Sequence, residues 1–387
     1  MLPERVLLLM HSPFMVNQQP LQLSRFPVTK NDQSNLQAWD AVDEYIINHL
    51  HELSIPSPSK IIVFNDNFGA LSLNLLEHHV SAVNDSFVSQ QGIHYNLQHN
   101  QLVNDNLTLL NSLQALPNTP DIILLKIPKS NALLIEQLCQ ISQIANQHTI
   151  IIAGARAKDI HRSTLKLFEQ YLGHTTTSLA VKKARLVLVN YNKQPQLSPY
   201  PTVWPLEHTK FNISNHANVF AREKLDIGAR FFSQNLPQVQ PDYQVFDLGC
   251  GNGVIGLSVL AQQPLAKLHF VDESFMAIAS ARQNITNNLP AQLENCQFIA
   301  NDCLTNIDAN YADIILCNPP FHQQQAITDH IAWQMFNDSF RVLKPGGELR
   351  IIGNRQLAYH VKLKRLFGQC TVIASNHKFV VLSSIKP

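Results

Sequence analysis

The sequence predicts an α/β protein with two tandem domains, each a parallel sheet covered by helices on both faces. Short apolar runs alternate with longer amphipathic segments, which is the pattern of strand–helix–strand units. The two halves also carry the same series of motifs at similar spacing. Between the halves, Pro195, Pro199, Pro201 and Pro205 exclude a regular helix or a central strand, since proline fixes φ and has no N–H donor.

Length and composition agree with two hydrophobic cores. The chain has 387 residues, of which 45% are hydrophobic and 15% charged, a normal globular balance. The net charge is only +1, which gives no sign of general nucleic-acid affinity. No run approaches the roughly 20 apolar residues of a membrane span, and the six cysteines form no CxxC pair. We therefore expect a cytoplasmic protein with reduced thiols, no bound metal and no membrane partner.

The proline-rich segment sets the expected domain boundaries. Residues 1–20 are interpreted as an N-terminal extension and residues 21–194 as the first domain. Residues 195–205 are the expected linker, and residues 206–387 form the second domain.

The second half shows its elements most clearly, because apolar runs of strand length are followed by amphipathic runs of helix length. The predicted strands are residues 244–248, 268–271, 313–317 and 348–352, and the predicted helices are residues 254–262, 275–287 and 328–343. Pro345, Gly346 and Gly347 predict a tight turn between the last helix and the last of these strands.

The two halves resemble each other closely enough to indicate duplication of one α/β domain. The matching segments are 61–75 with 244–259, 82–97 with 270–285, and 120–128 with 312–320. The chemistry is retained in the second copy alone: its three loop glycines have one counterpart, Gly69, and Lys126 stands where the second copy has Asn318. The first domain is therefore expected to be a degenerate copy, with a structural or substrate-binding role.

A glycine-rich loop opens the second domain's site. Asp247, Gly249 and Gly251 follow a strand and precede a helix, where glycine lets a ligand approach the backbone. Asp272 ends the next strand, at the place from which a carboxylate binds ribose hydroxyls. Residues 251–256 also form a GxGxxG pattern, which taken alone favours a nicotinamide dinucleotide equally. Asp247 argues against that alternative, because its carboxylate would repel a pyrophosphate and suits a cationic amino-acid ligand.

The most specific motif is Asn318-Pro319-Pro320-Phe321, directly after a predicted strand. A carboxamide oxygen and a backbone carbonyl can accept the two hydrogens of an amine conjugated with a heterocycle, and so aim its lone pair. Pro319 removes a competing donor, the two prolines stiffen the loop, and Phe321 offers a face on which a base can stack. The motif therefore indicates transfer of a group to an exocyclic amine, with rate gained mainly from positioning.

With these motifs, the second domain resembles the class I S-adenosylmethionine-dependent methyltransferases that carry the (D/N/S)-P-P-(Y/F) signature of amine methylation. From about residue 21 onward, the whole chain resembles the bacterial ribosomal RNA guanine-N2 methyltransferases, and it is most similar to those of the large subunit. Segments 23–46, 215–232 and 318–336 carry this resemblance.

The resemblance implies two Rossmann-like domains, the second with a seven-stranded sheet whose antiparallel last hairpin would come from residues 344–352 and 378–382. It implies S-adenosylmethionine as the cofactor, with the adenine edge at Asn301 and Asp302 and the ribose at Asp272 or the adjacent Glu273. The remaining implied cofactor contacts are Asp247, Gly249, Gly251, Asn318 and Phe220, the last within the segment 218–228 that would line the methionine end. The implied catalytic residues are Asn318, Pro319, Pro320 and Phe321.

The function expected from this resemblance is methyl transfer to the N2 amine of one guanine in 23S rRNA, with the base unpaired or flipped. The first domain would then be structural or RNA-binding, and the paired domains would allow a monomer. Alternative substrates for the same loop are small-subunit rRNA, adenine N6 and protein glutamine. A nicotinamide-dependent oxidoreductase and a non-catalytic rRNA-binding factor are the less favoured alternatives.

Overall fold

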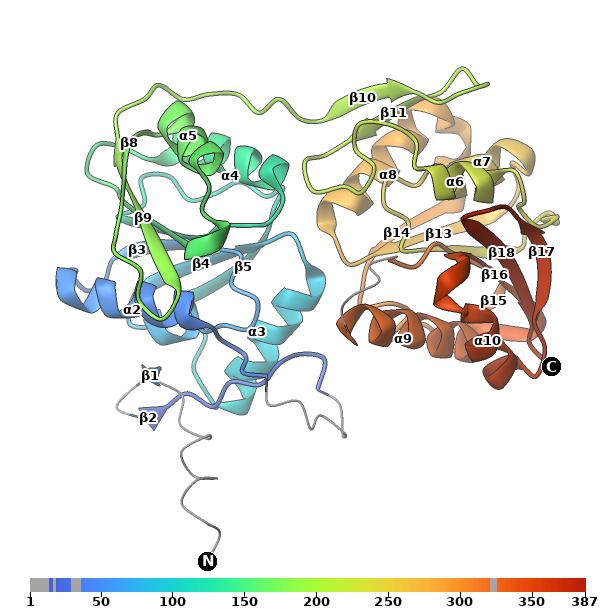
Figure 1. The fold of residues 1–387 in the computed structure, drawn as a ribbon, viewed down its shortest axis with the longest axis horizontal. Helices are drawn as coiled ribbons and strands as arrows, with labels where there is room; N and C mark the ends of the chain where they lie inside the picture. Colours follow the sequence, from blue (N-terminus) through green and yellow to red (C-terminus); the bar gives the residue numbers. More distant parts are fainter. Residues whose placement is uncertain (1–13, 17–18, 29–35, 321–325) are drawn as a thin grey trace, which may run out of the picture. The chain divides into compact units, whose positions relative to one another are not determined.

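The computed structural model describes residues 14–16, 19–28, 36–320 and 326–387 and consists of two compact units (Figure 1). Unit 1 ends at Pro199 and unit 2 begins at Tyr200. Each unit contains a seven-stranded sheet, mostly parallel. The predicted α/β fold with a seven-stranded second sheet is thus confirmed.

Unit 1 has the strand order β5-β4-β3-β6-β7-β9-β8, in which β9 runs antiparallel to both of its neighbours. Its strands are β1 (Met15–Val16), β2 (Gln19–Pro20), β3 (Lys60–Phe64), β4 (His79–Asn84), β5 (Leu107–Asn111), β6 (Ile122–Lys126), β7 (Ile150–Arg156), β8 (Gly173–Thr177) and β9 (Ala184–Tyr191). Its helices are α2 (Ala41–Leu53), α3 (Phe87–His99), α4 (Asn131–Ile144) and α5 (Arg162–Tyr171).

Unit 2 repeats this order as β14-β13-β12-β15-β16-β18-β17, with β18 antiparallel to both neighbours. Its strands are β10 (Thr202–Pro205), β11 (Asn212–Asn215), β12 (Gln244–Leu248), β13 (Lys267–Asp272), β14 (Cys296–Ala300), β15 (Ala312–Cys317), β16 (Leu343–Asn354), β17 (Thr371–Ser375) and β18 (Phe379–Ile385). Its helices are α6 (Ile227–Ser233), α7 (Val254–Gln262), α8 (Phe275–Asn288), α9 (Ala326–Val342) and α10 (Tyr359–Phe367).

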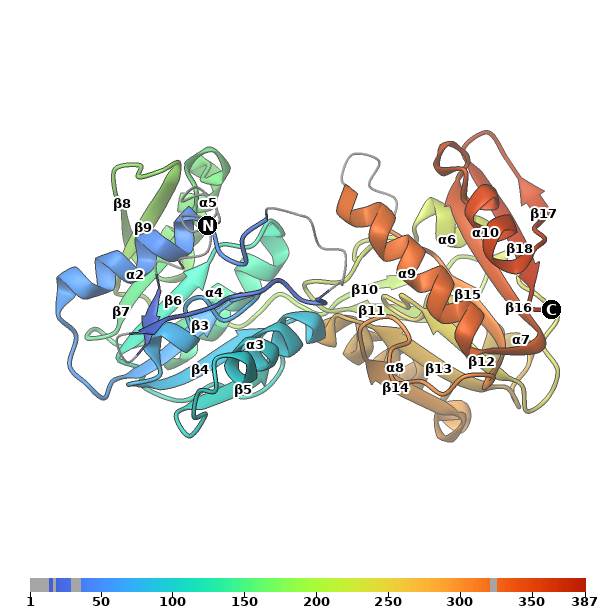
Figure 2. The ribbon, with the colours of Figure 1, turned by 90° about the horizontal axis from the view of Figure 1, so that it is seen from below.

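Successive side chains of a strand point to opposite faces of a sheet, and helices cover both faces here, so both faces of each sheet are buried. In β12, Val245 packs with the α7 and α8 residues, whereas Phe246 packs with those of α9 and α10. Figure 2, which views the molecule from below, accordingly has α9 and α10 in front of the unit 2 sheet. In unit 1, Ile61 and Ile62 divide in the same way, the first toward α2 and α3 and the second toward α4 and α5.

Part of the expected linker is ordered as a strand. Residues 202–205 form β10, which pairs antiparallel with β11. Trp204 and its cross-strand partner Ile213 are buried in the unit 2 core, so hydrophobic contact outweighs the proline content. Pro205 is tolerated because it ends an edge strand, where a missing donor costs little.

Two further details of unit 2 differ from the sequence prediction. Pro345, Gly346 and Gly347 lie inside β16, within a register shift against β15, instead of forming a separate turn. Gly346 has φ +79°, a left-handed conformation that lets the strand bulge and continue. In addition, the expected antiparallel pairing of residues 344–352 with 378–382 is confirmed as β16 with its neighbour β18, but the last hairpin is β17–β18, because sequence analysis had missed β17.

The same asparagine contact occurs in both units. In α8, Asn284 Oδ1 accepts the Ser214 N–H at 2.7 Å and Nδ2 donates to the Ser214 carbonyl at 3.0 Å. In α3, Asn96 makes the same pair of hydrogen bonds with Ser24, both at 2.8 Å. In unit 1 this amide ties the segment before β3 to α3, the helix after β4. In unit 2 it ties the segment before β12 to α8, the helix after β13.

Candidate functional site

The predicted site residues of unit 2 come from loops at one edge of the sheet. Strands β14, β13, β12 and β15 are neighbours and run parallel, so their carboxyl ends meet there. Asp247 is in register with Phe270 of β13 and Leu316 of β15. In open α/β sheets, this is the edge at which ligands bind.

Asp247 is a buried carboxylate, only 3% exposed, near the end of β12. Its Oδ2 accepts the N–H of Gly256 at 2.8 Å. Burial raises the pKa of Asp247 to about 7, although the Gly256 hydrogen bond lowers it. A Cβ on Gly256 would lie 2.3 Å from the Phe270 ring, so glycine is required for α7 to approach this carboxylate.

The loop after β12 leaves open space beside its backbone. Gly249 and Gly251 have φ of +70° and +53°, in the left-handed region that favours glycine. A Cβ on Gly251 would meet no described atom within 4 Å. The Gly251 N–H donates to Asp272 Oδ2 at 2.9 Å, which connects this loop to the end of β13.

Asp272 is oriented by two backbone groups. Its Oδ1 accepts the Ser274 N–H at 3.0 Å, while its Oδ2 accepts the Gly251 N–H. The adjacent Glu273 has an exposed side chain. Sequence analysis did not rank these two carboxylates; the structure shows that of Asp272 held by two backbone N–H groups at the edge.

Asn301 and Asp302 follow β14 and have different surroundings. Asn301 is buried, and its Nδ2 donates to the Thr305 carbonyl at 2.6 Å, so this amide shapes its own loop. Asp302 is half-buried, and its Oδ1 accepts a hydrogen bond from Gln334 Nε2 at 2.9 Å. Burial raises the pKa of Asp302, and the Gln334 hydrogen bond lowers it.

Asn318 stands directly after β15, and its side-chain oxygen Oδ1 is a buried acceptor. Within the described part of the chain, Asn318 Oδ1 has no hydrogen-bond partner. Such a group costs about 1–3 kcal/mol if it stays unpaired, and it can accept a hydrogen bond from a ligand. Pro319 is buried and Pro320 exposed beside it, whereas Phe321 lies outside the described residues.

Phe220 is a predicted site residue with an exposed side chain. It lies between β11 and α6 with 64% of its surface exposed, so its ring is not buried against the edge where Asp247 and Asn318 lie. Nothing in the structure assigns it a contact with a cofactor.

Sequence analysis missed a set of polar residues on α9 that hold the loop after β14. Gln334 bonds to Asp302, Asp338 accepts the Leu304 N–H at 3.1 Å, and Arg341 donates to the Leu304 carbonyl at 2.6 Å. Their spacing places them on one helix face. That polar face was visible in the sequence, but no local rule says which loop it would contact.

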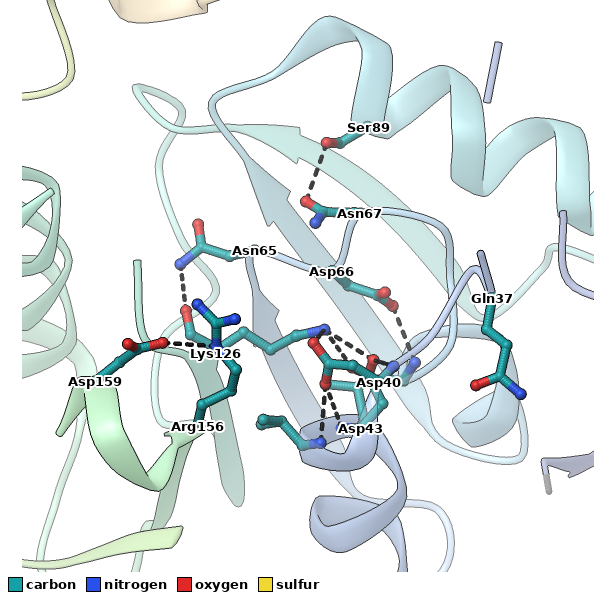
Figure 3. Close-up of polar contacts among 12 residues, drawn as sticks. Gln37, Asp40, Asp43, Asn65, Asp66, Asn67, Ser89, Lys126, Arg156 and Asp159 are labelled. Atoms are coloured by element: carbon teal, nitrogen blue, oxygen red, sulfur yellow. Dashed lines mark hydrogen bonds and ion pairs between the residues drawn. The ribbon is translucent and has the colours of Figure 1, made fainter. Parts of the chain in front are cut away.

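The corresponding edge of unit 1 is filled by its own side chains (Figure 3). Strand registers place Val63 where unit 2 has Asp247, and Lys126 where it has Asn318. The Lys126 ammonium lies 2.7 Å from Asp43 Oδ1 and 3.6 Å from Asp40 Oδ2, with Asp43 only 1% exposed. The Asp66 carboxylate accepts N–H groups from its own loop, including that of Gly69 at 3.0 Å.

The described residues contain no helix with the length and apolar character needed to cross a membrane. They also contain no group of three or more His, Cys, Asp or Glu side chains arranged to hold a metal. All six cysteines, which lie in the described part of the chain, are free thiols.

Comparison with known proteins assigns the class. The family model described as methyltransferase small domain matches residues 210–383, and the model described as RLMG N-terminal domain matches residues 11–195. A 16S rRNA N2 methyltransferase from T. thermophilus, solved in complex with AdoMet and guanosine, shares the fold with a TM-score of 0.72 and 20% identity, over 90% of this chain and 92% of that one. The fold and the family model together define an S-adenosylmethionine-dependent methyltransferase.

The family follows from close relatives. Ribosomal RNA large subunit methyltransferase G of Colwellia psychrerythraea is 58% identical, covering 97% of this chain and 100% of that protein. The protein of the same name from Pseudoalteromonas translucida is 50% identical, covering 94% and 95% of the two chains. The chain belongs to the ribosomal RNA large subunit methyltransferase G family and is an rRNA methyltransferase that uses S-adenosylmethionine.

Proposed function

We propose that unit 2 transfers a methyl group from S-adenosylmethionine to the exocyclic N2 amine of a guanine in 23S rRNA. The observation that carries this proposal is the buried Asn318 Oδ1, an acceptor without a partner among the described residues, at the carboxyl edge of the sheet. An amine N–H supplies the donor that this oxygen lacks. The name of the relatives supports the large subunit as the source of the RNA.

The residues at the edge fit the cofactor. The buried Asp247 suits the cationic amino group of the methionine part, and the open space beside Gly251 allows a ligand to pass the backbone. Asp272, fixed by two N–H groups, is placed for the ribose hydroxyls, and Asp302 for the adenine amino group. Asn301 then acts by shaping the loop that presents Asp302. When bound, the cofactor supplies a methyl group activated by its sulfonium.

The chain's own contribution is to position the target amine. Asn318 Oδ1 accepts one amine hydrogen and the Pro319 carbonyl accepts the other, so that the nitrogen lone pair points at the methyl carbon. Pro320 stiffens the loop, and Phe321 stacks on the base in this proposal. The amine becomes acidic once methylated, and its proton then leaves to solvent; no strong general base is required.

The proposal extends to the role of unit 1, the oligomeric state and the location of the protein. We infer that unit 1 is a degenerate copy of unit 2 that supports the fold or binds RNA. The shared strand order and the paired Asn96 and Asn284 contacts support a duplication. We also propose a cytoplasmic monomer in which residues 195–199 connect the two units.

Substitution of Asn318 tests the proposed role directly. Asn318→Ala removes the acceptor, and methyl transfer to rRNA should fall by at least about a hundredfold, while S-adenosylmethionine affinity changes little. Labelled methyl incorporation and calorimetric binding give the two numbers, and Asn287→Ala, which removes an exposed amide on α8, is the matched control. An Asn318→Ala protein with full transfer activity would contradict the assignment.

A further inference from the structure

Helix α9 contacts the loop after β14 in two different ways. Asp338 and Arg341 bond to the backbone of that loop, at Leu304 and Ile307. These contacts fix the path of the loop whatever side chains it carries. Gln334, one turn before Asp338 on the same face, instead donates to a side chain, the Asp302 carboxylate, at 2.9 Å.

The contact with Gln334 affects the pKa of Asp302. Partial burial raises the pKa of this carboxyl, which favours the protonated form. A neutral amide donor stabilises the ionised form, and the Gln334 hydrogen bond accordingly lowers the pKa. Gln334 therefore favours the ionised, accepting form of Asp302, as do the Cys303 hydrogen bond and the His330 charge, which also lower this pKa.

The contact also controls the direction of the carboxylate. Gln334 Nε2 engages Oδ1 and so fixes the orientation in which the carboxylate meets a ligand. An ionised carboxylate only accepts hydrogen bonds. It matches the exocyclic amino group of adenine, a donor, and repels the carbonyl that hypoxanthine carries at the same ring position.

We propose that Gln334 is a positioning residue for the cofactor's base: its amide holds the Asp302 carboxylate in a fixed direction at the sheet edge, so that the site selects an adenine amino group. This inference rests on the proposed placement of the adenine at Asp302. It assigns to α9 a part in cofactor recognition that the loops around Asp247 and Asn318 do not supply.

The test compares two ligands that differ at one ring position, S-adenosylhomocysteine and S-inosylhomocysteine, with the full-length protein in calorimetric titrations. Wild type should prefer the adenosine ligand. Gln334→Leu, of similar size but without a donor, should lose about tenfold affinity for the adenosine ligand and little for the inosine ligand, a loss typical of a charge-assisted hydrogen bond. Asn337→Leu is the matched control, because the Asn337 amide bonds to the Trp333 carbonyl within α9.

The pH dependence gives a second readout. Without Gln334 the pKa of Asp302 rises further, so the loss in Gln334→Leu relative to wild type should grow as the pH falls. The Cys303 hydrogen bond and the His330 charge, which also lower this pKa, are present in both proteins. Unchanged discrimination in Gln334→Leu, or an equal loss for both ligands, would overturn the inference. Equal affinity of wild type for both ligands would instead overturn the placement of adenine at Asp302, on which the inference rests.

Discussion

At the scale of single residues, the site contains groups whose environment is unfavourable until a ligand arrives. Asp247 is 3% exposed, and burial raises its pKa from an ordinary value of 3.8 to about 7. Asn318 Oδ1 is likewise buried, without a partner in the described part of the chain. Perturbed groups of this kind cluster at functional sites, and each has a complementary group on the proposed ligands: a cationic amine for Asp247 and an N–H for Asn318.

The raised pKa of Asp247 predicts that cofactor affinity depends on pH. Below about pH 7 the free protein holds a proton on this carboxyl, which must leave before the cofactor's amino group can pair with it, so affinity should fall by up to about tenfold per pH unit. The stability of the free protein has the opposite pH dependence to the cofactor affinity. Because the pKa of Asp247 is higher in the folded than in the unfolded state, the free energy of unfolding decreases as pH rises from about 4 to about 7. The cofactor-induced rise in Tm should therefore grow with pH in this window.

Asp247→Asn keeps the size of the side chain but removes the titration. Its cofactor affinity should be weak and nearly independent of pH between about pH 6 and about pH 8. A wild-type affinity that is equally flat over this range would show that Asp247 is ionised by other means or does not contact the cofactor.

At the scale of elements, one amide fixes the chain that enters unit 2. Asn284 is fully buried, and its three hydrogen bonds to Ser214 and to the Asn252 carbonyl tie α8 to β11 and to the glycine loop. Sequence periodicity identified α8 but could not identify this contact, because it joins residues 70 apart in the chain.

Asn284→Ala should destabilise unit 2 by about 2–4 kcal/mol, since it leaves three buried backbone groups unpaired. The control is Thr286→Ala, which removes an exposed hydroxyl that bonds within α8. Hydrogen exchange at residues 212–215 measures the effect locally and should accelerate only in Asn284→Ala. Unchanged protection there would mean that β11 is held by its pairing with β10 alone.

In unit 1, β6 and α2 are joined by the ion pair of Lys126 and Asp43. Lys126→Met should destabilise this unit by about 3–5 kcal/mol, because it leaves the Asp43 carboxylate buried without a cation. The double substitution with Asp43→Leu should recover most of that loss. Thermal unfolding of the single and double variants tests this, and additive losses would contradict a direct pairing of the two side chains.

At the scale of the whole molecule, the sequence predicted the fold well and the site in part. The alternation of strands and helices placed β12, α7, α8 and β15 to within a residue or two, because local patterning determines them. It missed β17, and it assigned β10 to a linker, because both depend on pairing or packing with distant segments. Motifs located the loop residues, whereas the Gln334 contact required the fold, since α9 and the loop after β14 meet only in three dimensions.

The replacements in unit 1 predict one cofactor site per chain. Val63 offers no carboxylate where unit 2 has Asp247, and Lys126 would repel a cationic ligand. Calorimetric titration of the full chain should give a stoichiometry of one, which Asp247→Asn should weaken and Lys126→Met should leave unchanged. Two sites of similar affinity would show that unit 1 retains a pocket despite these replacements.

The most direct measurement is methyl transfer from labelled S-adenosylmethionine to protein-free 23S and 16S rRNA in parallel, followed by nucleoside analysis. We predict label in N2-methylguanosine from 23S rRNA only, with none when Asn318→Ala replaces the wild type. Label in another nucleoside, or in 16S rRNA, would contradict the proposed target. If the protein binds the cofactor but labels neither RNA, that result would contradict methylation of free 23S rRNA.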